Sequence, residues 1–465
     1  YSAALRNSEK MEDKMRLADA HIKMVKLFYR LNDVKASLKH SFIAKRLIKD
    51  IGYRKGMLEL ILALSQLMIY RRKYNSYMRI IEKALGSLDE NDKYYWAMLK
   101  TVYGRILTKK NHFDEALKCL EESIEVLESL EEYEGLIPAL NSIGTIYSEY
   151  YYDIEKATEY FEKNLSICRR TNNLSFMSYS YNNLAEMYRE KDKFKESLEY
   201  YNKALEMISK NRNKYSEVMT YMNQALVNMA LEDYKKSQKY MEKARFILDN
   251  SKDLGEAAQY YNIYKAIFFY NIGYFQKAMD YAQKSVDMCI SWGTEADIEA
   301  LYIIDLCNAK LYKGYDYEKL IDFTEELFNN RKYKLGRKAC HSFAELFAEE
   351  GKFDEARVFL TLSDEYSKVI STSHLESEHE YLSAIVCSKD ERRDKLEIIT
   401  ASGNTIESNE IKWKVYKSLG LELYDQGEYY EALKSFITSM NALRMLVEGV
   451  PDEYKVKFLL SHSRY

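Results

Sequence analysis

The chain repeats one amphipathic helical pattern about every forty residues, and this repetition constrains its fold more than any other feature. Each copy begins with an aromatic or β-branched residue, here called the anchor. The ten clear anchors are Val34, Tyr74, Phe113, Ile154, Phe194, Tyr234, Phe275, Tyr317, Phe353 and Tyr429. Successive anchors lie 36 to 42 residues apart, except for a final gap of 76 residues. That gap fits two periods, with a degenerate copy near Glu391.

Small residues recur at fixed distances from the anchors. They lie three and ten positions after six of them: Ala116 and Ser123, Ala157 and Asn164, Ser197 and Ala204, Ser237 and Ala244, Ala278 and Ser285, Ala432 and Ser439. This spacing places them on one stripe of a helix. Another small residue lies nine positions before seven anchors: Ser65, Gly104, Ala185, Ala225, Ala266, Ala344 and Gly420. Short polar turns such as "REKDK" (189–193) separate the two helices, so we expect about eleven closely packed antiparallel pairs.

Composition supports a helical array. Only two prolines and sixteen glycines occur in 465 residues, so few residues are available to break helices. No apolar run approaches the roughly 18 residues that would span a bilayer. The six cysteines are scattered without a CxxC pair, which favours buried free thiols in a reducing cytoplasm. The first residues contain neither an initiator Met nor a signal peptide, as expected for a piece of a longer protein.

Two segments carry the pattern most clearly, "YNNLAEMYREKDKFKESLEYYNKALEMI" (181–208) and "YKSLGLELYDQGEYYEALKSF" (416–436). They resemble the tetratricopeptide repeat (TPR), two antiparallel helices with small residues where they cross. The period of about forty, rather than thirty-four, resembles TPR regions of bacterial peptide-pheromone receptors and of maltose-activator-like transcription regulators. The resemblance implies an all-α, right-handed superhelical solenoid, with a concave face formed mainly by the first helix of each pair.

The repeats suggest an organisation along the chain. Residues 1–370 hold the first nine units, and 1–90 form a basic end with 19 Lys and Arg against 10 Asp and Glu. Segment 371–410 is expected to be a degenerate repeat or a hinge, and 411–448 the last clear repeat. Pro451, followed by two acidic residues, marks a capping or linker helix within 449–465.

No catalytic signature is found. The sequence contains no Gly-rich phosphate loop, GxSxG elbow or HExxH motif, so we predict a non-catalytic protein without cofactor or metal. His374 and His379 point in different directions on a helix, which disfavours a shared metal. A pair between His374 and Glu378 is geometrically possible, but an exposed polar surface is the favoured interpretation of that segment.

The offset from each anchor identifies residues of first helices that would face the groove. These are Arg105, Asn141, Thr145, Asn182, Asn183, Glu186 and Asn223. Asn is unfavourable inside helices, so its recurrence in successive first helices suggests a ladder of amides. The resemblance implies that Asn141, Asn182 and Asn223 hold a peptide backbone. The alternative is that these amides only form hydrogen bonds between helices.

The sequence therefore predicts a peptide-binding or partner-binding array, the sensory region of a larger cytoplasmic bacterial regulator whose effector lies outside this chain. The alternative is a passive scaffold that acts through its outer face or its basic end, where Arg71, Arg72 and Lys73 stand together. Neither a membrane nor direct nucleic-acid binding is favoured, and a homo-oligomer remains open.

Overall fold

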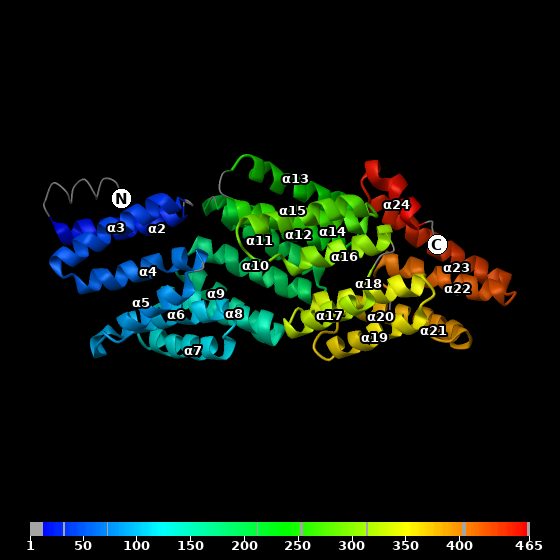
Figure 1. Cartoon of the computed structure of the whole chain (residues 1–465), viewed down its shortest axis with the longest axis horizontal. Helices are drawn as coiled ribbons and strands as arrows, with labels where there is room; N and C mark the ends of the chain where they lie inside the picture. Colours follow the sequence, from blue (N-terminus) through cyan, green and yellow to red (C-terminus); the bar gives the residue numbers. More distant parts are fainter. Residues whose placement is uncertain are drawn as a thin grey trace. The chain divides into compact units, whose positions relative to one another are not determined.

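The computed structural model describes residues 13–30, 33–71, 73–211, 213–251, 254–312, 315–401 and 406–462. Every regular element in these ranges is helical (Figure 1). The chain divides into two compact units, residues 1–180 and 181–465.

Among the described residues, the first unit contains eight complete α-helices and the start of α10. They are α2 (Lys14–Arg30), α3 (Val34–Ile51), α4 (Arg54–Tyr70), α5 (Tyr74–Leu85), α6 (Lys93–Lys109), α7 (Phe113–Ser129), α8 (Tyr133–Ile146) and α9 (Ile154–Arg170). A short 3-10 helix, η1 (Glu90–Asp92), precedes α6, and a π-helical turn, η2 (Tyr147–Tyr151), follows α8.

The second unit contains the rest of α10 and all later helices. They are α10 (Leu174–Glu190), α11 (Phe194–Asn211), α12 (Lys214–Ala230), α13 (Tyr234–Asp249), α14 (Gly255–Asn271), α15 (Phe275–Ser291), α16 (Ile298–Tyr312), α17 (Tyr317–Asn329), α18 (Tyr333–Glu349), α19 (Phe353–Ser367), α20 (Ser373–Val386), α21 (Lys389–Ala401), α22 (Asn409–Asp425), α23 (Tyr429–Gly449), η3 (Asp452–Tyr454) and α24 (Lys455–His462).

The anchors mark the helix boundaries. Each of the ten is the first residue of the second helix of a pair, from Val34 of α3 to Tyr429 of α23. Between them, α2 to α23 form eleven sequential pairs in the described part of the chain. The predicted all-α, TPR-like solenoid of helix pairs is therefore confirmed.

The small residues lie where helices cross. All twelve residues at the three-and-ten positions are buried. The Ser123 hydroxyl donates to the carbonyl of Ala97 (2.8 Å), and the Ser197 hydroxyl donates to that of Ala185 (2.8 Å). A Cβ on Gly420 would lie 2.6 Å from the Phe436 ring, so only a glycine permits this approach. These contacts join the first helix of a pair to its second.

The turns between helices place one residue in the left-handed region. Glycine does so in several turns, for example Gly351 (φ 74°) and Gly427 (φ 85°). Other turns use a polar residue instead, including Glu131 (φ 57°) and Glu232 (φ 61°). Left-handed backbone at this position lets the chain leave one helix and begin the next within a few residues.

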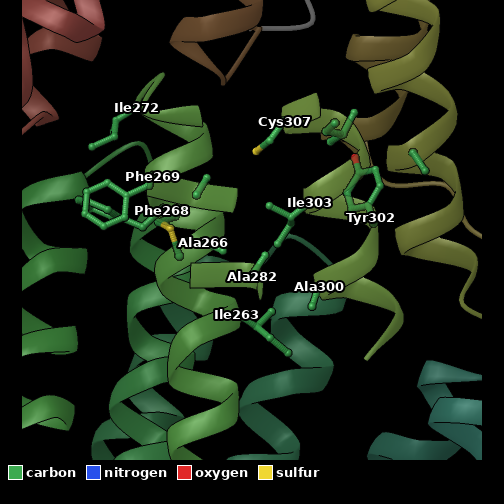
Figure 2. Close-up of a cluster of buried hydrophobic side chains, with 14 of the residues drawn as sticks. Ile263, Ala266, Phe268, Phe269, Ile272, Ala282, Ala300, Tyr302, Ile303 and Cys307 are labelled. Carbon is green, nitrogen blue, oxygen red and sulfur yellow. The ribbon is translucent and has the colours of Figure 1, made fainter. Parts of the chain in front are cut away.

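The largest apolar core of the second unit runs through successive pairs. Figure 2 shows part of it, to which α14 contributes Phe268 and Phe269 and α16 contributes Tyr302 and Ile303. Phe268, Ile263 and Ala266 are fully buried. The first helices also contact one another in order, α12 with α14, α14 with α16, α16 with α18, α18 with α20 and α20 with α22. A continuous core of this kind explains why a single pair need not be stable by itself.

The C-terminal segment returns to an earlier part of the second unit. Tyr454 packs against Phe268, Phe269 and Tyr274, with ring centroids 5.1 to 6.2 Å apart. Phe458 of α24 belongs to the same core and is 2 % exposed. The segment 371–410 contains the helices α20 and α21, which pack against each other as the other pairs do.

Across the described ranges, no helix combines the length and apolar character needed to cross a membrane. The six cysteines are free thiols, four of them buried and two, Cys119 and Cys387, partly exposed.

Candidate functional site on the first helices

The seven residues predicted to line a groove are divided between the two units. In the first unit, Arg105 lies on α6, whereas Asn141 and Thr145 lie on α8. In the second unit, Asn182, Asn183 and Glu186 lie on α10, and Asn223 lies on α12. All seven are partly buried.

The first-unit residues make local contacts. The Arg105 guanidinium donates to the side-chain oxygen of Gln66 on α4 (3.1 Å), and burial lowers the pKa of Arg105 from its ordinary value. The Thr145 hydroxyl donates to the carbonyl of Asn141 (3.0 Å), one turn earlier in the same helix. These contacts orient the side chains, and none of them joins the three residues into one cluster.

The second-unit asparagines bridge neighbouring first helices. The Asn182 side-chain oxygen accepts a hydrogen bond from the hydroxyl of Thr220 on α12 (3.0 Å). The Asn223 side-chain oxygen accepts one from the hydroxyl of Tyr264 on α14 (3.4 Å), and burial raises the pKa of Tyr264, which keeps this donor neutral. These hydrogen bonds between helices are the alternative role that the sequence analysis gave for the asparagines. Both side chains are nevertheless partly exposed.

Glu186 belongs to a tight ionic cluster at the end of α10. The Arg189 guanidinium donates to one Glu186 carboxylate oxygen from two nitrogens, at 3.0 and 2.7 Å. It also lies 2.8 Å from a Glu190 oxygen, and the Tyr201 hydroxyl donates to Glu186. Burial by itself lowers the pKa of Arg189, but the two carboxylates outweigh it and hold the pKa above its ordinary value. Arg189 is therefore a fixed cation.

Lys334 of α18, which lies 145 positions after Arg189, completes this cluster. Lys334 lies 3.4 Å from a Glu190 oxygen and 3.7 Å from an Asp192 oxygen. Asp192 in turn accepts a hydrogen bond from the backbone N–H of His374 at the start of α20 (3.4 Å). We call Glu186, Arg189, Glu190, Asp192 and Lys334 the polar network. It brings the end of α10 to the beginnings of α18 and α20, with every member retaining 10 to 27 % side-chain exposure.

A second ionic cluster links α18 to α22. Lys414 lies 2.6 Å from Glu345 and 3.0 Å from Glu410. Burial lowers the pKa of Lys414, but the two carboxylates outweigh it and hold the pKa well above its ordinary value. First helices of the second unit thus present fixed charges of both signs.

A buried cluster on α18, α19 and α20 has the arrangement of a nucleophile, a base and a carboxylate. The Ser363 hydroxyl lies 2.9 Å from Nε2 of His341, and Nδ1 of His341 lies 2.9 Å from a Glu378 oxygen. Nδ1 of His379 lies 3.3 Å from the same hydroxyl. Glu378 therefore contacts His341, and the considered pairing with His374 is limited to an electrostatic interaction. Among the described residues, no group of three or more His, Cys, Asp or Glu side chains is placed to hold a metal ion.

One cavity is lined by none of the residues of these clusters. It has a volume of about 730 Å³ and is lined by α19 and the α20–α21 turn, including Arg357, Lys389 and Arg392. None of the predicted groove residues lines it. In the first unit, Arg71 and Lys73 are exposed, whereas Arg72 lies outside the described residues.

Comparison with known proteins identifies one stretch of these helix pairs. Residues 153–210, which span α9 to α11, match the family profile described as tetratricopeptide repeat. This chain is a TPR repeat protein. Comparison with curated proteins gave no match.

Several solved structures share the fold at low sequence identity. One is a Rap protein complexed with competence and sporulation factor, with a TM-score of 0.56, 16 % identity, and coverage of 78 % of this chain and 100 % of that one. The apo form of RapI gives a TM-score of 0.51 at 14 % identity, covering 76 % of this chain and 98 % of that chain. Aspartyl phosphate phosphatase F from Bacillus subtilis gives 0.50 at 15 % identity, covering 76 % and 94 %. These values establish similarity of fold.

The TPR register also explains the buried serine cluster. Ser363 lies ten positions after its anchor, as Ser123 does, and the Ser123 hydroxyl contacts Thr101 in the same way (2.6 Å) that Ser363 contacts His341. Ser363 is fully buried and lies inside α19. The cluster thus occupies the same place in its repeat as the packing contact between Ser123 and Thr101.

Sequence reasoning missed Arg189, Asp192 and Lys334. Arg189 follows Glu186 by three positions, which would have suggested a pair on one helix face. No spacing in the sequence connects α10 with Lys334, because their contact depends on how the intervening repeats stack.

Proposed function

We propose that this TPR protein binds a peptide, or an extended segment of a partner protein, on the first helices of its second unit. The observation that carries the proposal is the polar network beside the asparagines of α10 and α12. The termini and backbone amides of a bound peptide need hydrogen-bond donors and acceptors on the protein that are held in place but still accessible. In this role the protein is the sensory or regulatory region of a larger cytoplasmic bacterial regulator.

The chemistry of the residues supports a polypeptide ligand. Asn182, Asn183 and Asn223 each offer an amide, which can both donate to and accept from a peptide backbone without regard to sequence. Arg189 and Lys334 are cations suited to a carboxylate, and Glu186 and Glu190 are suited to an amino group or a basic side chain. The Rap structure complexed with competence and sporulation factor shares this fold, which supports the proposal by analogy.

The proposal includes the absence of catalysis by this chain. It is supported by the burial of Ser363, the hydroxyl with the most suggestive neighbours. The fold does not decide the question, because one similar structure is named an aspartyl phosphate phosphatase. Acetyl phosphate is a simple acyl phosphate with which to test this part. Protein-dependent hydrolysis above the spontaneous rate would contradict it.

A binding experiment tests the proposal directly. The full chain is immobilised and exposed to a random library of unstructured peptides, and retained peptides are measured again by fluorescence anisotropy. We expect Asn182→Ala and Asn223→Ala each to weaken binding about fivefold, the effect of losing roughly 1 kcal/mol of hydrogen bonding. Asn329→Ala, on the exposed end of α17, is the matched control and should have no effect. Failure to retain any peptide, or binding unchanged in both variants, would refute the proposed surface.

The scaffold alternative makes a different prediction. It places the partner on the basic end, where Arg71 and Lys73 are exposed. Under this alternative, Arg71→Glu combined with Lys73→Glu abolishes capture of a partner protein, and the asparagine variants have no effect.

A further inference from the structure

In several repeats, the second helix has an outer edge that the next repeat covers. The residues four and eleven positions after the anchor lie on this edge. In α15 they are Met279 and Val286, and both belong to the apolar core that α15 shares with α16. In α7 they are Leu117 and Ile124, and both are partly buried against neighbouring clusters. Coverage by the following helix therefore accounts for apolar residues at these two positions.

In α23, the last of these second helices, the same edge is uncovered. Its equivalent residues are Leu433, which is 56 % exposed, and Met440, which is 69 % exposed. The segment that follows does not cover them, because Tyr454 and Phe458 pack against the core of α14 and α15.

The uncovered edge is also wider than its counterparts. Ile437, eight positions after the anchor, is 52 % exposed, and Tyr430 is 70 % exposed. In eight other repeats the position of Ile437 is polar: Glu82, Glu121, Glu162, Asn202, Glu242, Gln283, Glu325 and Thr361. Phe42 stands there in the only other repeat that has a clear anchor. Tyr430, Leu433, Ile437 and Met440 follow helical spacing and form one exposed apolar stripe on α23, of the kind that marks protein interfaces.

We propose that this stripe is the interface of a homodimer, in which α23 packs antiparallel against α23 of a second copy. The chemistry of the helix favours this occupant. Arg444 lies seven residues after Ile437, on the same face as the stripe, and Tyr430 lies seven residues before it, next to Glu431. If Ile437 lies on the two-fold axis, Arg444 of each copy lies opposite Tyr430 and Glu431 of the other copy.

A parallel arrangement lacks this complementarity, because it sets Arg444 against Arg444 and Glu431 against Glu431. An isologous contact needs only one surface that is complementary to itself, and the antiparallel arrangement of α23 meets that condition. Arg444 and Glu431 now pair within their own helix, with Glu448 (3.2 Å) and Lys434 (2.9 Å), and all four are exposed. These weak surface pairs can exchange for contacts between the copies.

The mass of the full chain in solution tests the proposal. Analytical ultracentrifugation over a wide concentration range should show a monomer–dimer equilibrium. Ile437→Glu should raise the dissociation constant at least tenfold, since it places a charge at the centre of the interface. Circular dichroism should show an unchanged helical fold, because Ile437 is already exposed. A chain that stays monomeric, or a dimer that survives Ile437→Glu, would overturn the proposal.

Two further variants test the antiparallel geometry. Ile437→Cys should form a disulfide-linked dimer on mild oxidation, because the two-fold axis brings this residue against its own copy. Thr361→Cys, at the equivalent exposed position of α19, and the unsubstituted chain are the controls and should remain unlinked. Arg444→Glu should weaken the dimer, and adding Glu431→Arg should restore it. Linking equal to the controls, or no restoration by the double exchange, would refute the antiparallel pairing.

Discussion

The carboxylate of Glu232 holds Asn409, which lies 177 positions later in the chain. It accepts hydrogen bonds from the Asn409 backbone N–H (3.1 Å) and side-chain amide (2.8 Å). The Ser408 hydroxyl (2.7 Å) and the Glu410 backbone N–H (3.0 Å) donate to the same carboxylate. A residue in the α12–α13 turn thus satisfies the first N–H groups of α22, where a negative charge is also favoured by the helix dipole.

Removal of this contact should weaken the second unit. We expect Glu232→Ala to lower the free energy of unfolding by about 2–3 kcal/mol, because charge-assisted hydrogen bonds at a helix N-terminus are lost. Glu131→Ala is the matched control, since Glu131 has the same turn position and backbone conformation in the first unit. Urea denaturation gives the difference, and hydrogen exchange at 409–412 shows where protection is lost. Equal effects of the two substitutions would contradict a special role for Glu232.

Removal of the Arg337 side chain should strongly lower the stability of the second unit. It is fully buried on α18, and its guanidinium donates to both Glu376 oxygens (2.6 and 3.0 Å) and to the Ile370 carbonyl (2.9 Å). Hydrogen bonding to Arg337 holds the pKa of Glu376 below its usual range, although burial opposes it.

We expect Arg337→Met to lower the free energy of unfolding by about 3 kcal/mol, because a buried acceptor and a carboxylate lose their partner. Arg357→Met, on the exposed side of α19, should change it by less than about 0.5 kcal/mol. Both are measured by chemical denaturation at neutral pH. A loss below 1 kcal/mol at Arg337 would show that water replaces the guanidinium.

The second unit should lose stability in acid through Glu378. Burial opposes ionisation, but the hydrogen bond from His341 and the charges of His341, His374 and Lys414 outweigh it and lower the pKa of Glu378 to about 2. A carboxyl with a folded-state pKa below its unfolded value stabilises the fold above the unfolded value. This contribution is lost as the pH falls from about 4.5 towards 2.

The comparison of wild type with Glu378→Gln isolates this effect. At pH 6 the variant should be less stable by on the order of 2–3 kcal/mol, and the difference should shrink as the pH approaches 2.5. Glu325→Gln, on the exposed face of α17, should show no such trend. Urea midpoints between pH 6 and 2.5 provide the test. A difference independent of pH would assign the loss to packing and not to charge.

The fold was predictable because the packing rules act locally. A small residue is needed wherever two helices cross, so Ala116 and Ser123 recur in register and reveal the pairs. Tyr429 and the other anchors begin helices because each follows a turn whose residues end the previous helix. These signals lie within one period of the sequence.

The candidate site was only partly predictable. Each repeat is rotated slightly relative to the one before, and the accumulated rotation decides which distant residues come into contact. The positions of Asn182 and Asn223 on first helices followed from the period. Their partners on the next first helix, Thr220 and Tyr264, did not. Lys334 contacts a helix four repeats earlier, and Glu232 contacts a helix five repeats later. No spacing rule in the sequence extends that far. Long-range polar contacts of this kind need coordinates.

A close approach of two helices in the first unit gives the last prediction. Gly144 of α8 faces the ring of Phe161 on α9, and a Cβ on this glycine would lie 2.6 Å from it. Phe161 is 2 % exposed and has little room to move. Gly144→Ala should therefore destabilise the first unit by about 1–2 kcal/mol, since overpacking exceeds the gain in helix propensity.

Gly86, at the end of α5, is the matched control, because it also has right-handed backbone (φ −67°) but its added Cβ would meet nothing nearer than 3.5 Å. Gly86→Ala should leave stability unchanged or raise it by up to about 1 kcal/mol, because alanine restricts the unfolded chain. Thermal and urea unfolding of both variants decide the sign. Phe161→Leu should recover part of the loss in the Gly144→Ala background by making space for the new methyl group. Opposite signs at the two glycines are the expected result, and equal signs would mean that the helix crossing is looser than the contact distance implies.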